Sequence, residues 1–305
     1  MDGGLEALAG RRLILVTGKG GVGRSAVAAA LASGLTAAGR RVLAVDAVGD
    51  GGLARNFGVG PDTAAGGRPQ RLTDGTTLLG LATSASLDEY LRLQLHLPFA
   101  ASVGPLGRVV DFVAAAAPAV REILTIGKIG WEVREGAWDT VVVDAPASGH
   151  VIELVAAPRN LGDFVTAGPL AEQTGWLRAL LDDPAVTAAV VVTLAEELPV
   201  SETLELRARL EAETGVLVGP TIVNRVPERP APDALAPLTA DTDGSGWGSV
   251  ARLVRDRATV ADRQLDRLRA QVSDVVLVAE ADETAVGPAG VSRWIRRQLF
   301  DEVGG

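Results

Sequence analysis

Short, fully apolar runs alternate along this chain with longer stretches of helical periodicity. The apolar runs are rich in Val, Ile and Leu and end at Gly, Asp or Asn, which is typical of strands buried on both faces of a sheet. The predicted strands occupy residues 12–18, 41–46, 139–144, 186–194, 216–224 and 273–280, and helical patterns cover residues 24–39, 249–271 and 289–300. This alternation predicts an α/β fold, a mostly parallel β-sheet flanked by helices.

One stretch interrupts the alternation. From about residue 86 to residue 135 the signals are mainly helical, as in "SLDEYLRLQLHL" and "AVREILTIGKIGWEV". We interpret it as a helical insertion carried by the sheet. Residues 226–248 are rich in Pro, Asp and Gly and read as a surface connection. We expect residues 1–305 to form a single domain with this insertion at about 86–135.

Charge and composition narrow the class of protein. The formal net charge is -9, so we expect no nucleic-acid partner, because phosphate neutralisation needs clustered Lys and Arg. The chain has no cysteine, which excludes disulfides and thiolate metal sites built by this chain. The first residues lack the order of a signal peptide, and the apolar runs are shorter than the ~20 residues of a membrane span. We expect a cytoplasmic location.

The motif "GKGGVGRS" follows the first predicted strand and leads into a helix. Strand, glycine-rich loop and helix in this order form a phosphate-binding loop, in which backbone N–H groups and the helix N-terminus meet phosphate oxygens. The candidate nucleotide-binding residues are Gly18, Lys19, Gly20, Gly21, Val22, Gly23, Arg24, Ser25 and Ala26. Ser25 is also the candidate Mg²⁺ ligand. The loop lysine is replaced by Arg24, and a lysine stands instead at the second position, Lys19.

An early lysine in such a loop marks the deviant Walker A class, and the chain resembles the family of the arsenite-pump ATPase (ArsA) and the tail-anchored-protein-targeting ATPase. "VVVDAPASGHVIELVAAP" is similar to the switch II segment of that family, and "VLAVDAVGDGGLARNFG" stands in the place of switch I. "APAVREILTIGKI" and "TIVNRV" also resemble family segments. The resemblance covers nearly the whole chain and is nearest to short actinobacterial-type members.

The resemblance implies a P-loop NTPase of the SIMIBI type that binds ATP or ADP with Mg²⁺ and works as a dimer. Lys19 would reach the nucleotide of the partner, and Asp46 would orient the attacking water. Asp144 would bind Mg²⁺ through water together with Ser25, and Asn224 would contact the adenine. Lys19, Asp46 and Asp144 are therefore the candidate catalytic residues, and the dimer would be a homodimer or a heterodimer with a related ATPase.

Two positions depart from the family pattern. Arg24 keeps the charge of the loop lysine, but its planar fork is larger and points differently from an ammonium group, so we expect slower ATP hydrolysis. Ala26 replaces a hydroxyl residue. Without cysteine the chain also lacks the soft ligands that arsenite prefers.

Three functions stay open. The first is a dimeric switch ATPase that acts on a protein client or a membrane-linked partner, with apolar segments of the insertion as a client surface. The second is a membrane-associating positioning ATPase of the MinD or ParA kind, in which "GVSRWIRRQLF" would touch the membrane peripherally through Val291, Trp294, Ile295 and Leu299. The third is a regulatory subunit that binds nucleotide without hydrolysing it. The two histidines, His96 and His150, do not make a metal site.

Overall fold

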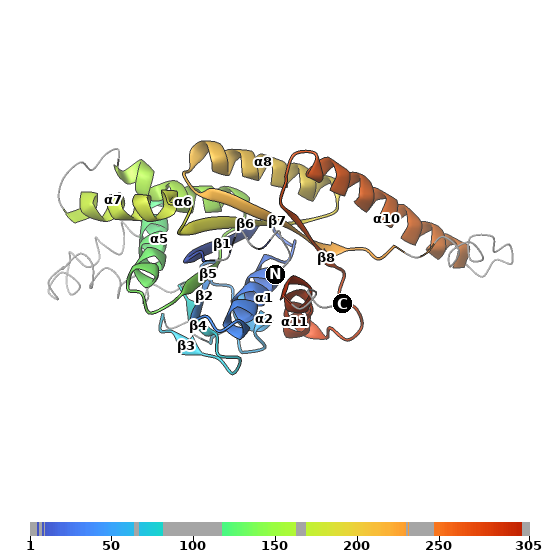
Figure 1. The fold of residues 1–305 in the computed structure, drawn as a ribbon, viewed down its shortest axis with the longest axis horizontal. Coiled ribbons are helices and arrows are strands. Elements are labelled where there is room, and N and C mark those ends of the chain that lie inside the picture. The colour runs from blue at the N-terminus through green and yellow to red at the C-terminus, as the bar shows by residue number, and fades with distance from the viewer. Residues whose placement is uncertain are drawn as a thin grey trace.

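A computed structural model describes residues 5, 8, 10–63, 67–81, 118–162, 169–229, 231 and 247–300. Its centre is an eight-stranded sheet with the strand order β3-β4-β2-β5-β1-β6-β7-β8 (Figure 1). The strands are β1 (Leu13–Gly18), β2 (Val42–Asp46), β3 (Gln70–Arg71), β4 (Thr77–Gly80), β5 (Thr140–Asp144), β6 (Thr187–Leu194), β7 (Leu217–Val226) and β8 (Val275–Ala279). Only β3 pairs antiparallel to its neighbour, so the prediction of a mostly parallel sheet is confirmed.

Helices cover both faces of the sheet (Figure 1). They are α1 (Arg24–Ala37), α2 (Gly52–Asn56), α5 (Pro118–Arg134), α6 (Ser148–Gly162), α7 (Pro169–Asp182), α8 (Glu197–Glu213), α10 (Trp247–Arg269) and α11 (Gly287–Phe300). Alternate strand residues point to opposite faces: Ile14 and Val16 pack with α1, α2 and α11, whereas Leu13 and Leu15 pack with α5, α6 and α8. This double coverage explains the fully apolar strands.

The last helix docks on the first. Ile295 and Leu299 of α11 are each 1% exposed, and Val291 and Trp294 pack against the same core as α1. The amphipathic face that a membrane-associating ATPase would use is therefore covered by the protein itself. Among the described residues, no helix has both the length and the apolar character that crossing a bilayer demands.

The sheet order brings the ends of non-consecutive strands together. β1 lies between β5 and β6, and β5 lies between β1 and β2. All four strands are parallel, so their carboxyl ends meet at one edge, on either side of the point where the strand order reverses. Ligands of open α/β sheets bind at such an edge.

Sequence patterns missed the short elements. β3 and β4 contain two and four residues and α2 contains five, too few to show a period. Of the expected helical insertion, α5 is described and is helical, while residues 82–117, with the expected client surface and His96, lie outside the described residues. Most of the expected 226–248 connection lies outside them too.

Candidate functional site

The glycine-rich loop joins the carboxyl end of β1 to the first turn of α1 and lies at the edge just described. Gly18, Gly21 and Gly23 have φ angles of 149°, 87° and 94°, which disfavour any residue with a Cβ. Gly18 also lies against β6, because a Cβ there would stand 2.2 Å from the carbonyl oxygen of Val192. The loop therefore takes a compact shape that only glycine permits, with the N-terminus of α1 behind it.

Asn224 holds the glycine-rich loop through a hydrogen bond. Its side-chain Nδ2 donates a hydrogen bond of 2.9 Å to the carbonyl oxygen of Val22, and both residues are buried. A Cβ at Gly23 would stand 2.4 Å from the same Nδ2. Asn224 thus supports the loop from the end of β7, a structural role that the sequence did not suggest. Its contact with adenine stays a prediction.

Asp46 and Asp144 lie side by side at the same edge. Each is the last residue of its strand, and the two are in register between β2 and β5. Oδ1 of Asp46 accepts hydrogen bonds from the backbone N–H groups of Val48 and Gly49, at 3.1 and 2.7 Å. By contrast, both carboxylate oxygens of Asp144 are buried without a hydrogen-bond partner of normal geometry. A buried, unsatisfied carboxylate calls for a ligand.

Burial dominates the protonation of both carboxyl groups. It raises the pKa of Asp46, although the backbone N–H groups around it act in the opposite direction. It raises the pKa of Asp144 to about 7, against the lowering influence of the Ser25 hydroxyl and the Arg24 guanidinium. The negative charges of Asp46 and Asp50 push that pKa further up. The site holds excess negative charge that a bound cation would neutralise.

Asp50 is a site residue that sequence reasoning missed. Its Oδ1 accepts a hydrogen bond of 2.7 Å from the backbone N–H of Gly52. A Cβ at Gly52 would stand 2.7 Å from that Oδ1 and 3.1 Å from Oγ of Ser25, so this turn lies directly against the loop. The available signal was an acidic residue in a glycine-rich turn four positions after Asp46.

Arg24 does not point along the loop. Its Nη1 donates a hydrogen bond of 2.5 Å to the backbone carbonyl of Ala145, the residue after Asp144. Thr17 makes a second link of this kind, since its hydroxyl donates to the carbonyl of Pro146 at 2.9 Å. The expected phosphate ligand is therefore joined to the start of the switch II segment. Ala26, in the first turn of α1, is buried in the core.

Lys19 turns outward from the loop. Its Nζ forms an ion pair with Glu202 on α8, and the two side chains are 48% and 23% exposed. The pair links residues 183 positions apart, which no local pattern reveals. Lys19 is thus accessible from outside the protomer but has an acceptor within its own chain.

The segment that the sequence predicts to be switch II begins with a strained turn. Ser148, at the start of α6, has a φ of 27°, which is uncommon for a residue with a side chain. His150 follows and is well exposed, with Nδ1 at 3.1 Å from Oε2 of Glu153. Gly149 has no atom within 4 Å of the place where a Cβ would stand.

These residues fit a nucleotide with Mg²⁺. The loop supplies backbone N–H groups, Ser25 a hydroxyl, and Asp144 a buried carboxylate without partner. No group of three or more acidic, His or Cys side chains placed to hold a metal occurs in the part of the chain that the structure describes. Mg²⁺ is usually held by few carboxylates together with phosphates and water.

Known proteins resemble this chain over the region that contains the candidate site. The family model described as "Anion-transporting ATPase" matches residues 11–174, which span the loop, both aspartates and switch II. The ATPase BagA of Mycobacterium tuberculosis is 37% identical over 238 residues, 75% of this chain and 69% of the relative. The ATPase GET3 of Chaetomium globosum is 26% identical over 153 residues, 49% of this chain and 44% of the relative. A putative arsenical pump-driving ATPase of Aquifex aeolicus is 25% identical over 150 residues, 48% and 38% of the two chains. The chain belongs to the anion-transporting ATPase family, together with relatives named as ATPases of the ArsA and GET3 kinds.

Proposed function

We propose that this protein binds and hydrolyses ATP with Mg²⁺ and works as a cytoplasmic dimeric switch on a protein client or a membrane-linked partner. Family membership supports the ATPase activity in general. The observation that carries the proposal for this chain is Asp144, whose two carboxylate oxygens are buried next to the Ser25 hydroxyl without a hydrogen-bond partner of normal geometry. A carboxylate in that state is costly unless it serves a ligand.

Each residue of the site has a part in the proposed reaction. The loop from Gly18 to Ser25 holds the phosphates, and Asp144 and Ser25 hold the metal. Mg²⁺, when bound, neutralises charge on the phosphate oxygens. Asp46 is held by hydrogen bonds from two backbone N–H groups, and its carboxylate would orient the attacking water. The conformation of the Ser148 turn follows the presence of the γ-phosphate, as switch segments do.

The dimer is proposed from Lys19. Its exposed position suits a cation that serves the nucleotide of a second protomer, as an arginine finger supplied in trans does. To do so, Lys19 must leave Glu202. The ion pair is half-exposed and so is weak enough to be exchanged for a phosphate.

Calorimetry with ATP or ADP and Mg²⁺, followed by phosphate release, tests the reaction. Mixing tests the dimer: Lys19→Ala should lower phosphate release from a wild-type partner while still binding ADP itself. The matched control is Arg263→Ala, which removes an exposed cation of α10 outside the nucleotide site. Normal hydrolysis by Lys19→Ala, with an oligomeric state that ignores nucleotide, would exclude the role in trans.

A second function, a regulatory subunit without hydrolysis, is supported by Arg24. Its guanidinium donates a hydrogen bond to the carbonyl of Ala145. In a working ATPase the lysine at this position of the loop would contact the phosphates instead. Phosphate release by the wild type and by Arg24→Lys separates the two functions. If only Arg24→Lys hydrolyses ATP, the chain is a regulatory subunit that lends Lys19 to a better-equipped partner. Equal rates show that the loop is adapted to arginine.

A further inference from the structure

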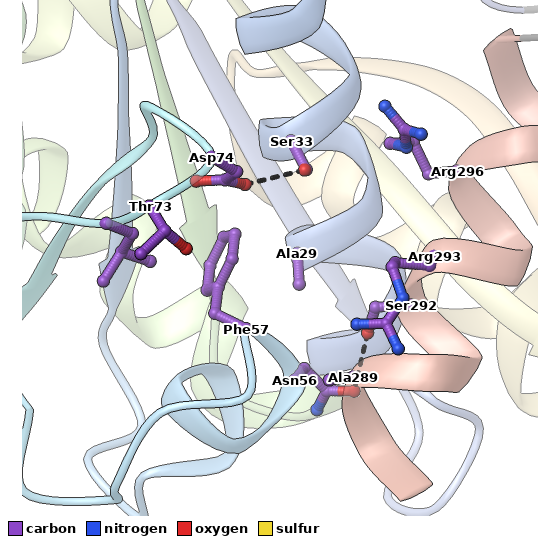
Figure 2. A pocket seen from close by; sticks show the side chains of 11 residues that line it. Ala29, Ser33, Asn56, Phe57, Thr73, Asp74, Ala289, Ser292, Arg293 and Arg296 are labelled. Carbon is purple, nitrogen blue, oxygen red and sulfur yellow. Dashed lines mark hydrogen bonds between the residues drawn. The ribbon is translucent and has the colours of Figure 1, made fainter. Parts of the chain in front are cut away.

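A cavity of about 330 Å³ lies between α1, α2, the turn after β3 and α11 (Figure 2). Its wall on one side is made by Phe57 and Asp74, and on the other by Arg293 and Arg296 of α11 (Figure 2). We call it the arginine pocket. Its size falls within the range of small-molecule sites, about 300–1,000 Å³. No residue of the loop from Gly18 to Ser25 lines it, so it is separate from the nucleotide site.

The two arginines lack acceptors. Arg293 and Arg296 are three positions apart and therefore lie on one face of α11. Among the residues that the structure describes, neither has a hydrogen bond or an ion pair, although Arg296 is half-buried. Arg293 is exposed, but the guanidinium of Arg296 has lost part of its water without gaining an acceptor, so it is incompletely satisfied.

The carboxylate of Asp74, which also lines the pocket, already accepts hydrogen bonds. Oδ2 of Asp74 accepts hydrogen bonds from the hydroxyls of Ser33 at 2.8 Å and Thr76 at 3.1 Å, and Oδ1 accepts one from the backbone N–H of Thr76 at 2.9 Å. The dashed line between Ser33 and Asp74 in Figure 2 marks the Ser33 bond. Asp74 therefore stabilises its own turn and leaves the arginines unpaired. The residues that line the pocket carry a net positive charge.

The remaining wall is partly apolar. Phe57 presents a half-buried ring opposite α11, and Ala29 of α1 forms the floor (Figure 2). The hydroxyl of Ser292 donates a hydrogen bond of 2.8 Å to Oδ1 of Asn56, and both residues line the pocket. One side of the pocket thus suits an anion and the other a flat apolar group.

We propose that the arginine pocket binds a small organic anion whose phosphate or carboxylate lies between Arg293 and Arg296 and whose flat apolar part contacts Phe57. Guanidinium groups bind these two anions through paired, charge-assisted hydrogen bonds. The ring of Phe57 supplies the contact that inorganic phosphate alone would lack.

The test titrates phenyl phosphate and benzoate into the wild-type protein by calorimetry, with ADP and Mg²⁺ in excess to occupy the other site. We expect saturable binding of one molecule per chain by at least one of the two probes, and weaker binding of inorganic phosphate and of phenol. Arg296→Ala should weaken binding about tenfold to a hundredfold, the effect of one charge-assisted hydrogen bond. Phe57→Leu should weaken it about two- to tenfold.

Arg297→Ala is the matched control. Arg297 is the next residue of α11, is exposed and does not line the pocket, so its loss removes the same charge from the same helix. Its binding should equal that of the wild type. The proposal is overturned if neither probe binds saturably at millimolar concentration, or if Arg297→Ala and Arg296→Ala weaken binding equally. Circular dichroism verifies that each variant keeps its helices.

Discussion

Replacing Glu202 by Gln tests whether the ion pair with Glu202 competes with the proposed contact between Lys19 and the nucleotide of a second protomer. The side chains of the Lys19–Glu202 pair are 48% and 23% exposed, and pairs of this kind contribute about 0.2–1 kcal/mol. If Lys19 must leave Glu202 to serve a second protomer, this free energy opposes association. Loss of the pair should therefore tighten ATP-dependent association by about 1.4- to 5-fold.

Sedimentation equilibrium with a non-hydrolysable ATP analogue measures this change. Glu205→Gln is the control, since it removes the same charge from the same helix at an exposed position that forms no ion pair with Lys19. Lys19→Ala should abolish the association that Glu202→Gln strengthens. Weaker association of Glu202→Gln, or unchanged association of Lys19→Ala, would refute the reasoning.

Three further predictions concern the nucleotide site. Gly18→Ala should lower the free energy of unfolding by about 2–5 kcal/mol, because its Cβ would stand 2.2 Å from the carbonyl oxygen of Val192 at a φ of 149°. Gly20→Ala is the control, since a Cβ there would have no atom within 4 Å. In urea unfolding it should change the free energy of unfolding by less than about 0.5 kcal/mol. Asp144→Asn should stabilise the nucleotide-free protein at pH 8 by roughly 4 kcal/mol, because burial raises the pKa of Asp144 from 3.8 to about 7 and the wild type bears the cost of ionisation above that pH. This gain should disappear in urea unfolding as the pH falls from 7 towards 4, and a gain that ignores pH would contradict the assignment. Asp46→Asn should slow phosphate release, while calorimetry should show nearly unchanged ADP binding. Loss of ADP binding would show that Asp46 serves nucleotide binding rather than hydrolysis.

Much of the site could be predicted because its signals are local. The glycine-rich loop requires a strand before it and a helix after it, and both are adjacent in sequence. Asp46 and Asp144 end apolar runs, and parallel pairing then places strand ends at one edge. The family resemblance rested on the same short segments, and the matching family model bears it out.

The rest depends on contacts between distant segments. Glu202 and Arg24 could be recognised as charged residues, but not as partners of Lys19 and of the carbonyl of Ala145, because these contacts join strands and helices through the fold. Asn224 could be located at a strand end, yet its hydrogen bond to the loop depends on the order of β6 and β7 in the sheet. The sequence therefore predicted the long elements, but it could not predict which distant residues their side chains contact.

The hydrogen bond between Asn224 and the carbonyl of Val22 also has a consequence for biosynthesis. It closes a loop of 202 residues, so the phosphate-binding loop lacks its support until β7 has joined the sheet. A chain synthesised from its N-terminus has made β1 and α1 long before that strand leaves the ribosome, and long-range contacts of this kind form late. The nascent chain thus lacks this support until Asn224 has been synthesised, and the residues made before it carry the glycine-rich sequence without the residue that holds it in shape.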